Sequence, residues 1–393
     1  MLPISSATAV TAAALPATTA VVWHAPVGCD FSGFFMESLT FAVGLSSLLQ
    51  NFHFDVGQCT SHMLSQLSSV ERDVLVQSQS TPQTSPGVLI LHKLPQQNYH
   101  ISTTQYPPHL LIGRQMTETT KLPLSEAKQA MRMDEVWVPT AFHRTIFTQS
   151  GVDPDRIFVM PEPMDTTFFQ RLDTDAKDLK DNDFTRFLSI FKWEERKGWD
   201  ILLTSYWTAF EQHDNVELAL RTYKPSWLSG EKSIQILLET YASEHFGKSL
   251  NELAKVVLYP SDLSKEQLRA LYASSNAFVL PTRGEGWCLP CVEAMSMQLP
   301  IVVTNFSGPT EYMTTKNAYP ISFTMKENGF AEPDVTEVMT ALKSIVVNPL
   351  QAVSKGAAAR HDVVTRFAVE VVAQKVVDRL SVLWHEKKNE DDL

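Results

Sequence analysis

Cysteine and net positive charge are both scarce in this chain. Only four of its 393 residues are cysteines, too few for the disulfide framework of a secreted domain, so we predict a reducing compartment and a cytoplasmic location. Lysine and arginine together number 33, against 44 acidic residues, and the formal net charge is −11. General binding of nucleic acid or of anionic membranes needs a basic surface, so no nucleic-acid partner is expected.

A hydrophobic run long enough to cross a bilayer is also lacking. The best candidate, Ala9–Val22, is rich in alanine and threonine and is interrupted by Pro16. It is shorter than the ~20 apolar residues that a membrane span requires, so we expect no transmembrane segment, while peripheral membrane contact stays open. Residues 1–20 contain no lysine or arginine. A signal peptide begins with positive charge, so this stretch is predicted to be a disordered leader.

Short apolar runs separated by helix-length segments make up the first half of the chain. At about 100–200 residues per domain, the length indicates two domains. Strands are predicted at 21–23, 88–91, 110–112, 136–138 and 157–159, and helices at 32–50 and 141–149. Gly151 is expected to end the second helix, because glycine readily adopts the left-handed conformation that follows a helix. This alternation predicts βαβ units and a parallel sheet.

An aspartate-rich stretch, 171–185, then interrupts the pattern before a second series begins. Its strands are predicted at 187–190, 216–220, 256–258, 277–280 and 301–303, and its helices at 199–210, 334–346 and 363–384. We predict an α/β protein with two tandem Rossmann-like doubly wound domains facing across a cleft, where a ligand would lie beyond the carboxyl ends of the strands. The expected parts are a leader at 1–20, an acceptor-side domain at 21–170, a linker at 171–185, a nucleotide-sugar-binding domain at 186–350, and a C-terminal helix and tail at 351–393 packing back toward the first domain.

The most informative segment runs from Pro281 to Pro300 and reads Pro-Thr-Arg-Gly-Glu-Gly-Trp-Cys-Leu-Pro-Cys-Val-Glu-Ala-Met-Ser-Met-Gln-Leu-Pro. It follows a predicted strand, and its two glycines, Gly284 and Gly286, are expected to permit a tight loop. A helix beginning near Leu289 would present backbone N–H groups and the positive end of its dipole to an anion. Glu285 and Glu293 flank this junction, and each carboxylate can accept hydrogen bonds from a vicinal diol of the kind that nucleotide sugars carry.

The segment resembles the signature of the retaining glycosyltransferases of family 4 (glycosyl transferases group 1), which have the GT-B fold. Four further stretches resemble the same family. They are Asp-Glu-Val-Trp-Val-Pro-Thr-Ala-Phe at 134–142, Pro-Glu-Pro-Met-Asp at 161–165, Phe-Lys-Trp-Glu-Glu-Arg-Lys-Gly at 191–198 and Ser-Gly-Pro-Thr-Glu-Tyr at 307–312. The resemblance covers about residues 20–385 and is most specific in the second half.

The resemblance implies roles for individual residues. Glu293 would bind the ribose hydroxyls and Glu285 the hydroxyls of the donor sugar, while the loop glycines and the backbone at Cys288 and Leu289 would lie at the phosphates. Lys192 and Lys197 match a basic pair that holds the donor diphosphate, where fixed positive charge stabilises the leaving group. Arg196 is expected to point to water.

Other candidates rest on position alone. Arg221 and Lys224 follow a predicted strand where the family places nucleotide contacts, and Gly33 lies where the family has a glycine-rich loop near the diphosphate, after Gly28 and Asp30. His92 ends a strand in the region from which, as the resemblance implies, a histidine lies near the donor sugar as a catalytic residue, and His24 competes with it for that role. Arg114 and Glu118 follow the next strand and could meet donor or acceptor. Lone loop charges are often merely solvated, and that alternative stays open for this group.

The pair Cys288 and Cys291 also suggests a metal or redox motif. A structural zinc needs four ligands, and Cys29 and Cys59 are isolated in the sequence and offer no second pair. A thioredoxin-like context is missing as well. We therefore predict that both cysteines are packing residues.

These observations predict a retaining, metal-independent glycosyltransferase of the hexosyl type. It would move a sugar from a nucleoside diphosphate sugar to an unknown acceptor hydroxyl, with no cofactor and no bound metal. Two alternatives stay open. One is a GT-B nucleotide-sugar epimerase or a phosphorylase, and the other is an inactive module that binds a nucleotide sugar.

Overall fold

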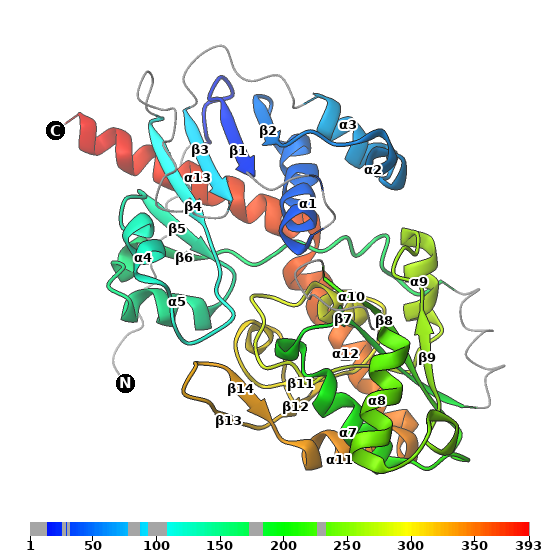
Figure 1. The fold of residues 1–393 in the computed structure, drawn as a ribbon. Coiled ribbons are helices and arrows are strands. Elements are labelled where there is room, and N and C mark those ends of the chain that lie inside the picture. Colours follow the sequence, from blue (N-terminus) through cyan, green and yellow to red (C-terminus); the bar gives the residue numbers. More distant parts are fainter. Residues whose placement is uncertain are drawn as a thin grey trace, which may run out of the picture. The chain divides into compact units, whose positions relative to one another are not determined.

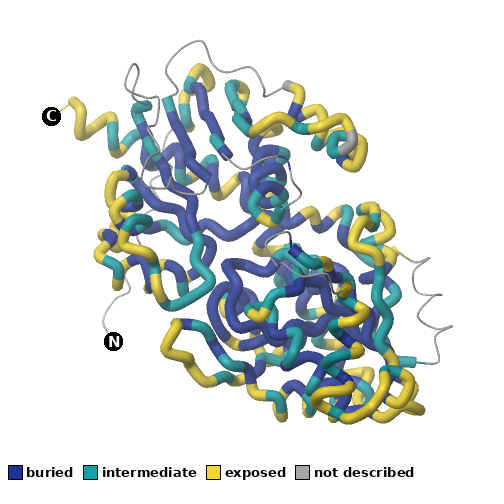
Figure 2. The backbone as a smooth tube through the Cα atoms, viewed as in Figure 1, coloured by how far each residue is buried: buried dark blue, intermediate teal, exposed yellow. Residues whose placement is uncertain are grey.

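The computed structural model describes residues 14–25, 29, 32–77, 87–92, 108–172, 184–225 and 233–392. Within them, two parallel six-stranded sheets are each accompanied by helices (Figure 1). The central strands of both sheets are buried (Figure 2). Most of the predicted leader (1–13) and of the predicted linker (173–183) lies outside the described residues, as do Gly28 and Asp30.

The first sheet has the strand order β2-β1-β3-β4-β5-β6. Its strands are β1 (Val21–Ala25), β2 (Phe52–Val56), β3 (Val88–His92), β4 (Leu110–Arg114), β5 (Glu135–Val138) and β6 (Ile157–Val159). The helices of this part of the chain are α1 (Gly33–Leu48), α2 (Ser61–Gln66), α3 (Ser69–Gln77), α4 (Leu124–Ala130) and α5 (Ala141–Gln149), with the short 3₁₀ turn η2 (Pro154–Arg156). Gly151 has a φ of 92° just after α5, which confirms that it ends that helix.

The second sheet has the strand order β12-β11-β10-β7-β8-β9. Its strands are β7 (Thr185–Lys192), β8 (Val216–Tyr223), β9 (Val256–Tyr259), β10 (Ala277–Leu280), β11 (Ile301–Thr304) and β12 (Ala318–Ile321), and a separate antiparallel hairpin joins β13 (Phe323–Met325) to β14 (Ala331–Pro333). The helices are α7 (Trp199–Ala209), α8 (Ile234–Phe246), α9 (Lys265–Ala273), α10 (Leu289–Ser296), α11 (Val335–Val347), α12 (Pro349–Phe367) and α13 (Val369–Asp391), with the 3₁₀ turns η3 (Glu195–Lys197), η4 (Leu250–Glu252) and η5 (Gly308–Glu311).

This architecture confirms the predicted α/β class with two Rossmann-like domains. The buried central strands were found because they are continuous apolar runs, such as Val88–His92. The edge strand β2 alternates apolar and polar residues over Phe52–Val56 and was missed, since only a strand buried on both faces reads as a continuous run. The predicted helix at 363–384 is wrong, because α12 ends at Phe367 and a new helix starts at Val369.

Contacts between residues divide the chain into two compact units. The first comprises Met1–Gln115, Lys128–Trp137 and Val369–Leu393, and the second comprises Met116–Ala127 and Val138–Ala368. Within the first unit the C-terminal helix α13 packs against α1. Gly44 makes room for this contact, since a Cβ built there would lie 2.8 Å from the Cβ of Ala373. Among the described residues, no helix combines the length and the apolar character that a membrane span needs.

All four cysteines are paired, which corrects two predictions: that Cys288 and Cys291 are packing residues, and that Cys29 and Cys59 are isolated. Cys29 forms a disulfide with Cys59, and Cys288 forms one with Cys291. The first pair was missed because 30 residues separate its members, and only the fold brings them together. The second pair was noticed as a motif but was assigned to packing.

Candidate functional site

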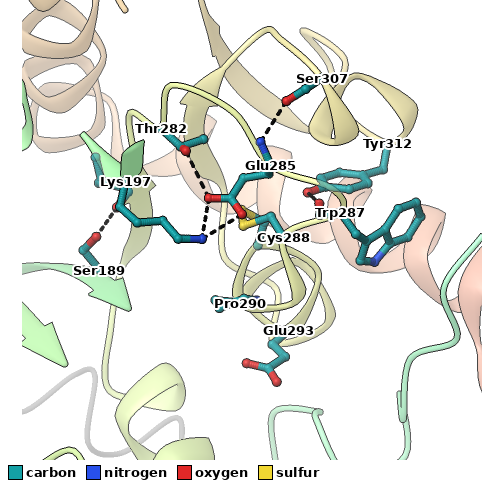
Figure 3. The surroundings of a disulfide bond; sticks show 12 residues. Ser189, Lys197, Thr282, Glu285, Trp287, Cys288, Pro290, Glu293, Ser307 and Tyr312 are labelled. Atoms are coloured by element: carbon teal, nitrogen blue, oxygen red, sulfur yellow. Dashed lines mark hydrogen bonds and ion pairs between the residues drawn. A yellow bond between two sulfur atoms is a disulfide. The ribbon is translucent and has the colours of Figure 1, made fainter. Parts of the chain in front are cut away.

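The predicted signature segment connects β10 to α10 and lies almost entirely within the second unit's interior. Residues 281–288 are buried, and α10 begins at Leu289 as expected. The backbone N–H of Glu285 donates to Ser307 Oγ at 2.9 Å, and the N–H of Gly308 donates to the Glu285 carbonyl at 2.9 Å. The loop after β11 thus holds the backbone of Glu285 from one side. Its carboxylate is directed toward the loop after β7 (Figure 3).

Glu285 and Lys197 form a buried ion pair. Lys197 Nζ lies 2.7 Å from Glu285 Oε1 and 2.8 Å from Oε2, and Thr282 Oγ1 donates to Oε1 at 3.0 Å. Arg196 Nη1 lies 3.4 Å from Glu285 Oε2. We call these four residues the Glu285 cluster. The exposed fraction of the side chain is 6% for Glu285 and 14% for Lys197, so the pair is largely withdrawn from water.

Two cations share one carboxylate in this cluster, and their effects on ionisation differ. Burial by itself would raise the pKa of Glu285, but the charges of Lys197 and Arg196 and the hydrogen bonds from Lys197 and Thr282 outweigh it, so the pKa lies below its usual range. Burial also lowers the pKa of Lys197, and the neighbouring Arg196 adds to this effect, while Glu285 opposes it. Burial thus disfavours the charged form of both groups, and each group's charge favours the charged form of the other.

The loop carrying Lys197 is fixed to the signature segment through backbone contacts. Gly198 has a φ of 67°, and a Cβ built on it would lie 1.9 Å from the carbonyl oxygen of Pro281. The N–H of Arg283 donates to the Arg196 carbonyl at 2.7 Å. A side chain at position 198 would therefore separate the two loops and pull Lys197 away from Glu285.

Arg196 does not point to water, contrary to the prediction. Its guanidinium donates to the Gly284 carbonyl at 2.6 Å and to Glu194 at 2.7 Å, and it lies 3.0 Å from Glu118. The side chain of Glu118 is 45% exposed. Partial burial nevertheless raises the pKa of its carboxyl group, and the charge of Arg196 offsets only part of that rise. The structure thus brings Glu118, whose role the sequence left open, to the Glu285 cluster.

Gly284 and Gly286 are required for a different reason from the one predicted. Neither has the positive φ of a tight glycine turn. Instead, the segment around Met116 and Glu118 lies directly on them, and a Cβ built on Gly284 would be 2.1 Å from the Glu118 carbonyl oxygen, while one on Gly286 would be 2.2 Å from Met116 Sδ. The glycines permit close packing of a segment that is distant in the sequence.

This difference in neighbours predicts different outcomes for two alanine substitutions. Gly286→Ala should lower the free energy of unfolding by about 1–3 kcal/mol through overpacking, and Met116→Ala in the same chain should restore most of it, because the obstructing atom belongs to a side chain. Gly284→Ala should not be rescued by any side-chain change at Glu118, because there the obstruction is backbone. Denaturant unfolding of the single and double variants measures this. Equal rescue at both positions would contradict the packing described here.

Glu293 lies one turn inside α10 and is held by a residue that the sequence did not single out. Tyr272, at the end of α9, donates its hydroxyl to Glu293 Oε2 at 2.6 Å, and the same hydroxyl lies 3.3 Å from the Pro290 carbonyl. Burial raises the pKa of Glu293, while Tyr272 and the charge of Arg221 oppose the rise. Figure 3 shows Glu293 on the opposite side of Cys288 and Pro290 from Glu285, so the two carboxylates face different regions.

The remaining candidates of the second unit lie near the carboxyl ends of its strands or at the start of α10. Lys192 is the last residue of β7 and is partly exposed, and Leu289 is the first residue of α10. Arg221 donates to the Ser261 carbonyl at 2.7 Å, and among the described residues its buried Nε has no hydrogen-bond partner. Lys224 follows β8 and is partly exposed. Arg221 lies close enough to Glu293 for its charge to lower the pKa of that carboxyl group, and the nucleotide contacts of Arg221 and Lys224 stay predictions.

His92 and Arg114 lie together in the first unit, within a buried polar cluster. His92 Nε2 lies 3.1 Å from Glu37 Oε2, and its Nδ1 is 3.2 Å from both Trp23 Nε1 and Ser38 Oγ. Arg114 donates to Glu37 Oε1 from Nε and Nη2 at 2.9 and 2.6 Å. Both ring nitrogens of His92 thus have partners inside the first unit, and its catalytic role stays a prediction.

Gly33 is the first residue of α1 and is exposed, and Ser32 before it accepts a hydrogen bond from the Phe35 N–H at 3.3 Å. This is an ordinary helix N-cap. The proposed contact of Gly33 with a diphosphate is untested by this geometry.

Sequence reasoning missed Tyr272 and Thr282 as supporting residues. Thr282 lies inside the signature segment and could have been named as a hydrogen-bond donor to the neighbouring carboxylate. Tyr272 gave no such signal, because it follows Leu271 in an amphipathic helix and reads as a core aromatic. Its hydroxyl is placed against Glu293 only by the packing of α9 on α10.

Comparison with known proteins supports the resemblance read from the motifs. Residues 227–345 match the sequence model of the family described as glycosyl transferases group 1. The match includes Glu285 and Glu293 and stops short of Lys192 and Lys197. No curated protein matches the chain.

Several solved structures share the fold across both sheets. HepE of Anabaena in complex with UDP has a TM-score of 0.69 at 12% identity, covering 93% of this chain and 100% of that one. Sucrose-phosphate synthase from Thermosynechococcus elongatus has a TM-score of 0.67 at 13% identity, covering 93% of this chain and 100% of that one. A glycosyltransferase from Rickettsia africae has a TM-score of 0.64 at 13% identity, covering 93% and 99%. At these identities the similarity establishes the GT-B fold.

Proposed function

We propose that this chain is a retaining glycosyltransferase that transfers a hexosyl group from a nucleoside diphosphate sugar to an acceptor hydroxyl. The observation that carries the proposal is the Glu285 cluster, in which a buried carboxylate meets a largely buried lysine. The cluster lies in the loop that leads into α10, and Glu293 lies in the first turns of that helix. HepE has also been solved with UDP-glucose, so UDP-glucose is the first donor to test.

In the proposed reaction, each charged residue acts at a different part of the donor. Lys197, with Lys192, neutralises the negative charge that develops on the leaving diphosphate. The start of α10 contributes its backbone N–H groups and dipole to the same phosphates. Glu285 accepts hydrogen bonds from the sugar hydroxyls, and Glu293 accepts them from the ribose. Among the residues of the second unit that the structure describes, no side chain stands out as a covalent nucleophile. The acceptor oxygen would therefore attack from the face that the diphosphate leaves, and a phosphate oxygen would take its proton.

Calorimetric titration with UDP, GDP and ADP, followed by a transfer assay with the sugar of the base that binds, tests this proposal. A bound nucleotide at a hundredfold excess over its dissociation constant should also stabilise the fold by about 2.7 kcal/mol. Absence of binding to all three nucleotides would reject the proposal. Conversion of the donor sugar without an acceptor would instead indicate an epimerase. Binding without transfer or hydrolysis would indicate an inactive binding module. The anomeric configuration of a transferred sugar, read by NMR, tests retention.

Turnover is expected to be unaffected by excess chelator. The cationic side chains and the start of α10 already supply positive charge for the leaving group, so we propose that no metal and no other cofactor takes part. Rates measured with and without EDTA, and after addition of Mg²⁺ or Mn²⁺, check this. Loss of turnover with EDTA and its recovery with either metal would contradict the proposed assignment of charge.

Replacing Tyr272 by phenylalanine is expected to make nucleotide binding fail at a higher pH. Glu293 must be ionised to accept two hydroxyl hydrogen bonds, and the Tyr272 hydroxyl lowers its pKa. Without that hydrogen bond the pKa of Glu293 rises further. When the pH is lowered, Glu293 in the variant is therefore protonated, and affinity is lost, at a higher pH than in the wild type. UDP titrations across the acidic range measure the shift. Glu293→Gln cannot ionise at this position, so the pH dependence that remains in that variant is the part due to the nucleotide's own phosphate. An unshifted acidic limb in Tyr272→Phe would contradict the role of Glu293.

The cytoplasmic location also remains a proposal. The small number of cysteines favours a reducing compartment, whereas the pairing of all four in disulfides favours an oxidising one. The acceptor and any membrane contact are not indicated by the described residues.

A further inference from the structure

Cys288 has a backbone conformation that residues with a side chain rarely adopt. Its φ is 78° and its ψ is 74°, in the left-handed region. Glycine enters this region freely, whereas the Cβ of an L-residue comes too close to the following carbonyl oxygen. A cysteine at this position therefore needs an interaction that holds it there.

The same residue is the N-cap of α10. The Cys288 carbonyl accepts hydrogen bonds from the N–H groups of Cys291 at 3.0 Å and of Val292 at 3.3 Å, and the Cys288 side chain makes no capping hydrogen bond. The conformation of Cys288 thus sets the direction in which the first turn of α10 presents its backbone N–H groups. Under the proposed function, those groups lie at the donor diphosphate.

Two contacts fix the backbone on either side of this residue. Tyr312 donates its hydroxyl to the Trp287 carbonyl at 2.6 Å, one residue before Cys288. The disulfide to Cys291 ties the Cys288 side chain to the first turn of the helix. Both cysteines are buried, with exposed fractions of 6% and 0%, and Figure 3 shows the surroundings of this disulfide.

We propose that the Cys288–Cys291 disulfide is a covalent clamp that positions the start of α10 for the donor diphosphate, and that donor affinity is therefore sensitive to reduction of this bond. The inference rests on the proposed function of the site. Cys288 and Cys291 are positioning residues. An ordinary N-cap side chain holds the start of a helix by a hydrogen bond, and here the disulfide bond holds it instead.

Opening the clamp needs a reductant, and a dithiol such as dithiothreitol supplies the two electrons. One reagent thiolate attacks a cysteine sulfur and forms a mixed disulfide, and the second reagent thiol displaces it to close the reagent's own ring. The two cysteines leave as thiols, with the protons that the reagent has lost. Cys288 then lacks its tether and is free to leave the left-handed region, which misdirects the start of α10.

The test compares two double variants that both lack the bond, made in the background Cys29→Ser/Cys59→Ser so that the other disulfide plays no part. Cys288→Ala/Cys291→Ala keeps a Cβ at the strained position and should bind UDP about tenfold more weakly than the background, which is about 1.4 kcal/mol. Cys288→Gly/Cys291→Ala adopts the left-handed conformation without a tether and should bind UDP at least fivefold more tightly than the alanine variant. Calorimetric titration gives both constants, and thermal melting gives the stability of each variant.

Reduction of the background protein should reproduce the alanine variant. After incubation with dithiothreitol, with thiols counted by alkylation and mass spectrometry, UDP affinity should fall about tenfold and return on reoxidation. Equal affinities of the glycine and alanine variants, or equal affinity before and after a confirmed reduction, would overturn the clamp while leaving the proposed function intact. Failure of the oxidised background to bind any nucleoside diphosphate would overturn both.

Discussion

Alanine in place of Lys197 is expected to slow sugar transfer at least a hundredfold. In the proposed reaction the leaving diphosphate gains negative charge in the transition state, and Lys197 is a largely buried cation held against Glu285 in the loop before α10. Loss of one such group costs about 3 kcal/mol of transition-state stabilisation. The rate with saturating donor, compared with the wild type, measures the effect. Activity within threefold of the wild type would contradict the assignment.

The ion pair with Glu285 makes a stability control necessary. Removing Lys197 leaves a buried carboxylate with only Arg196 and Thr282 as partners, and breaking a buried pair is itself destabilising, by about 3–5 kcal/mol when no other cation remains. Lys197→Ala/Glu285→Gln removes the uncompensated charge as well. The free energy of unfolding should therefore recover in the double variant, while binding of free UDP, which lacks the sugar assigned to Glu285, stays weaker than in Glu285→Gln alone. Equal UDP affinity of the double variant and Glu285→Gln would show that Lys197 acts only by maintaining the fold.

The two glutamates of the signature are expected to fail in different ways. Glu293→Ala should weaken binding of free UDP about ten- to hundredfold, because two ribose hydroxyls lose their acceptor in a mostly buried site, a loss of about 1–3 kcal/mol. Glu285→Ala should bind UDP almost normally, since the sugar that it contacts is missing from the free nucleotide. It should nevertheless turn over the sugar donor poorly, because its contacts matter at the reacting ring.

Calorimetric titration of both variants, beside their transfer rates, decides between these expectations. Arg196 keeps its contacts with Glu194 and Glu118 in Glu285→Ala. Lys197 loses the carboxylate that opposes the lowering of its pKa, and the bound diphosphate would supply the negative charge that replaces it. Tyr272 keeps the Pro290 carbonyl as a neighbour in Glu293→Ala. If Glu285→Ala weakens UDP as much as Glu293→Ala does, the division of roles is wrong. If neither change alters binding or rate, the signature segment has no part in function.

The amino-acid sequence by itself was sufficient for the fold class and for finding the segment that carries the candidate site. Central strands such as Val88–His92 are buried on both faces and therefore read as continuous apolar runs. The helix Ala141–Gln149 was predicted with its observed bounds, because Thr140 and Gly151 are local signals for its two ends. The signature segment was recognisable for a similar reason, since its residue types and their spacing lie within one continuous stretch.

Only the tertiary structure decided which residues meet that stretch. Arg196 reads as a solvated loop charge, yet it lies against Gly284 and Glu118. Gly284 and Gly286 read as turn residues, yet Gly284 admits the backbone of Glu118 and Gly286 the side chain of Met116, more than a hundred positions earlier in the chain. Cys29 and Cys59 read as unrelated and are bonded. In each case the partner is distant in sequence, and local patterns report only on backbone conformation and burial, whereas ion pairs, close packing and disulfides depend on which surfaces the fold brings together.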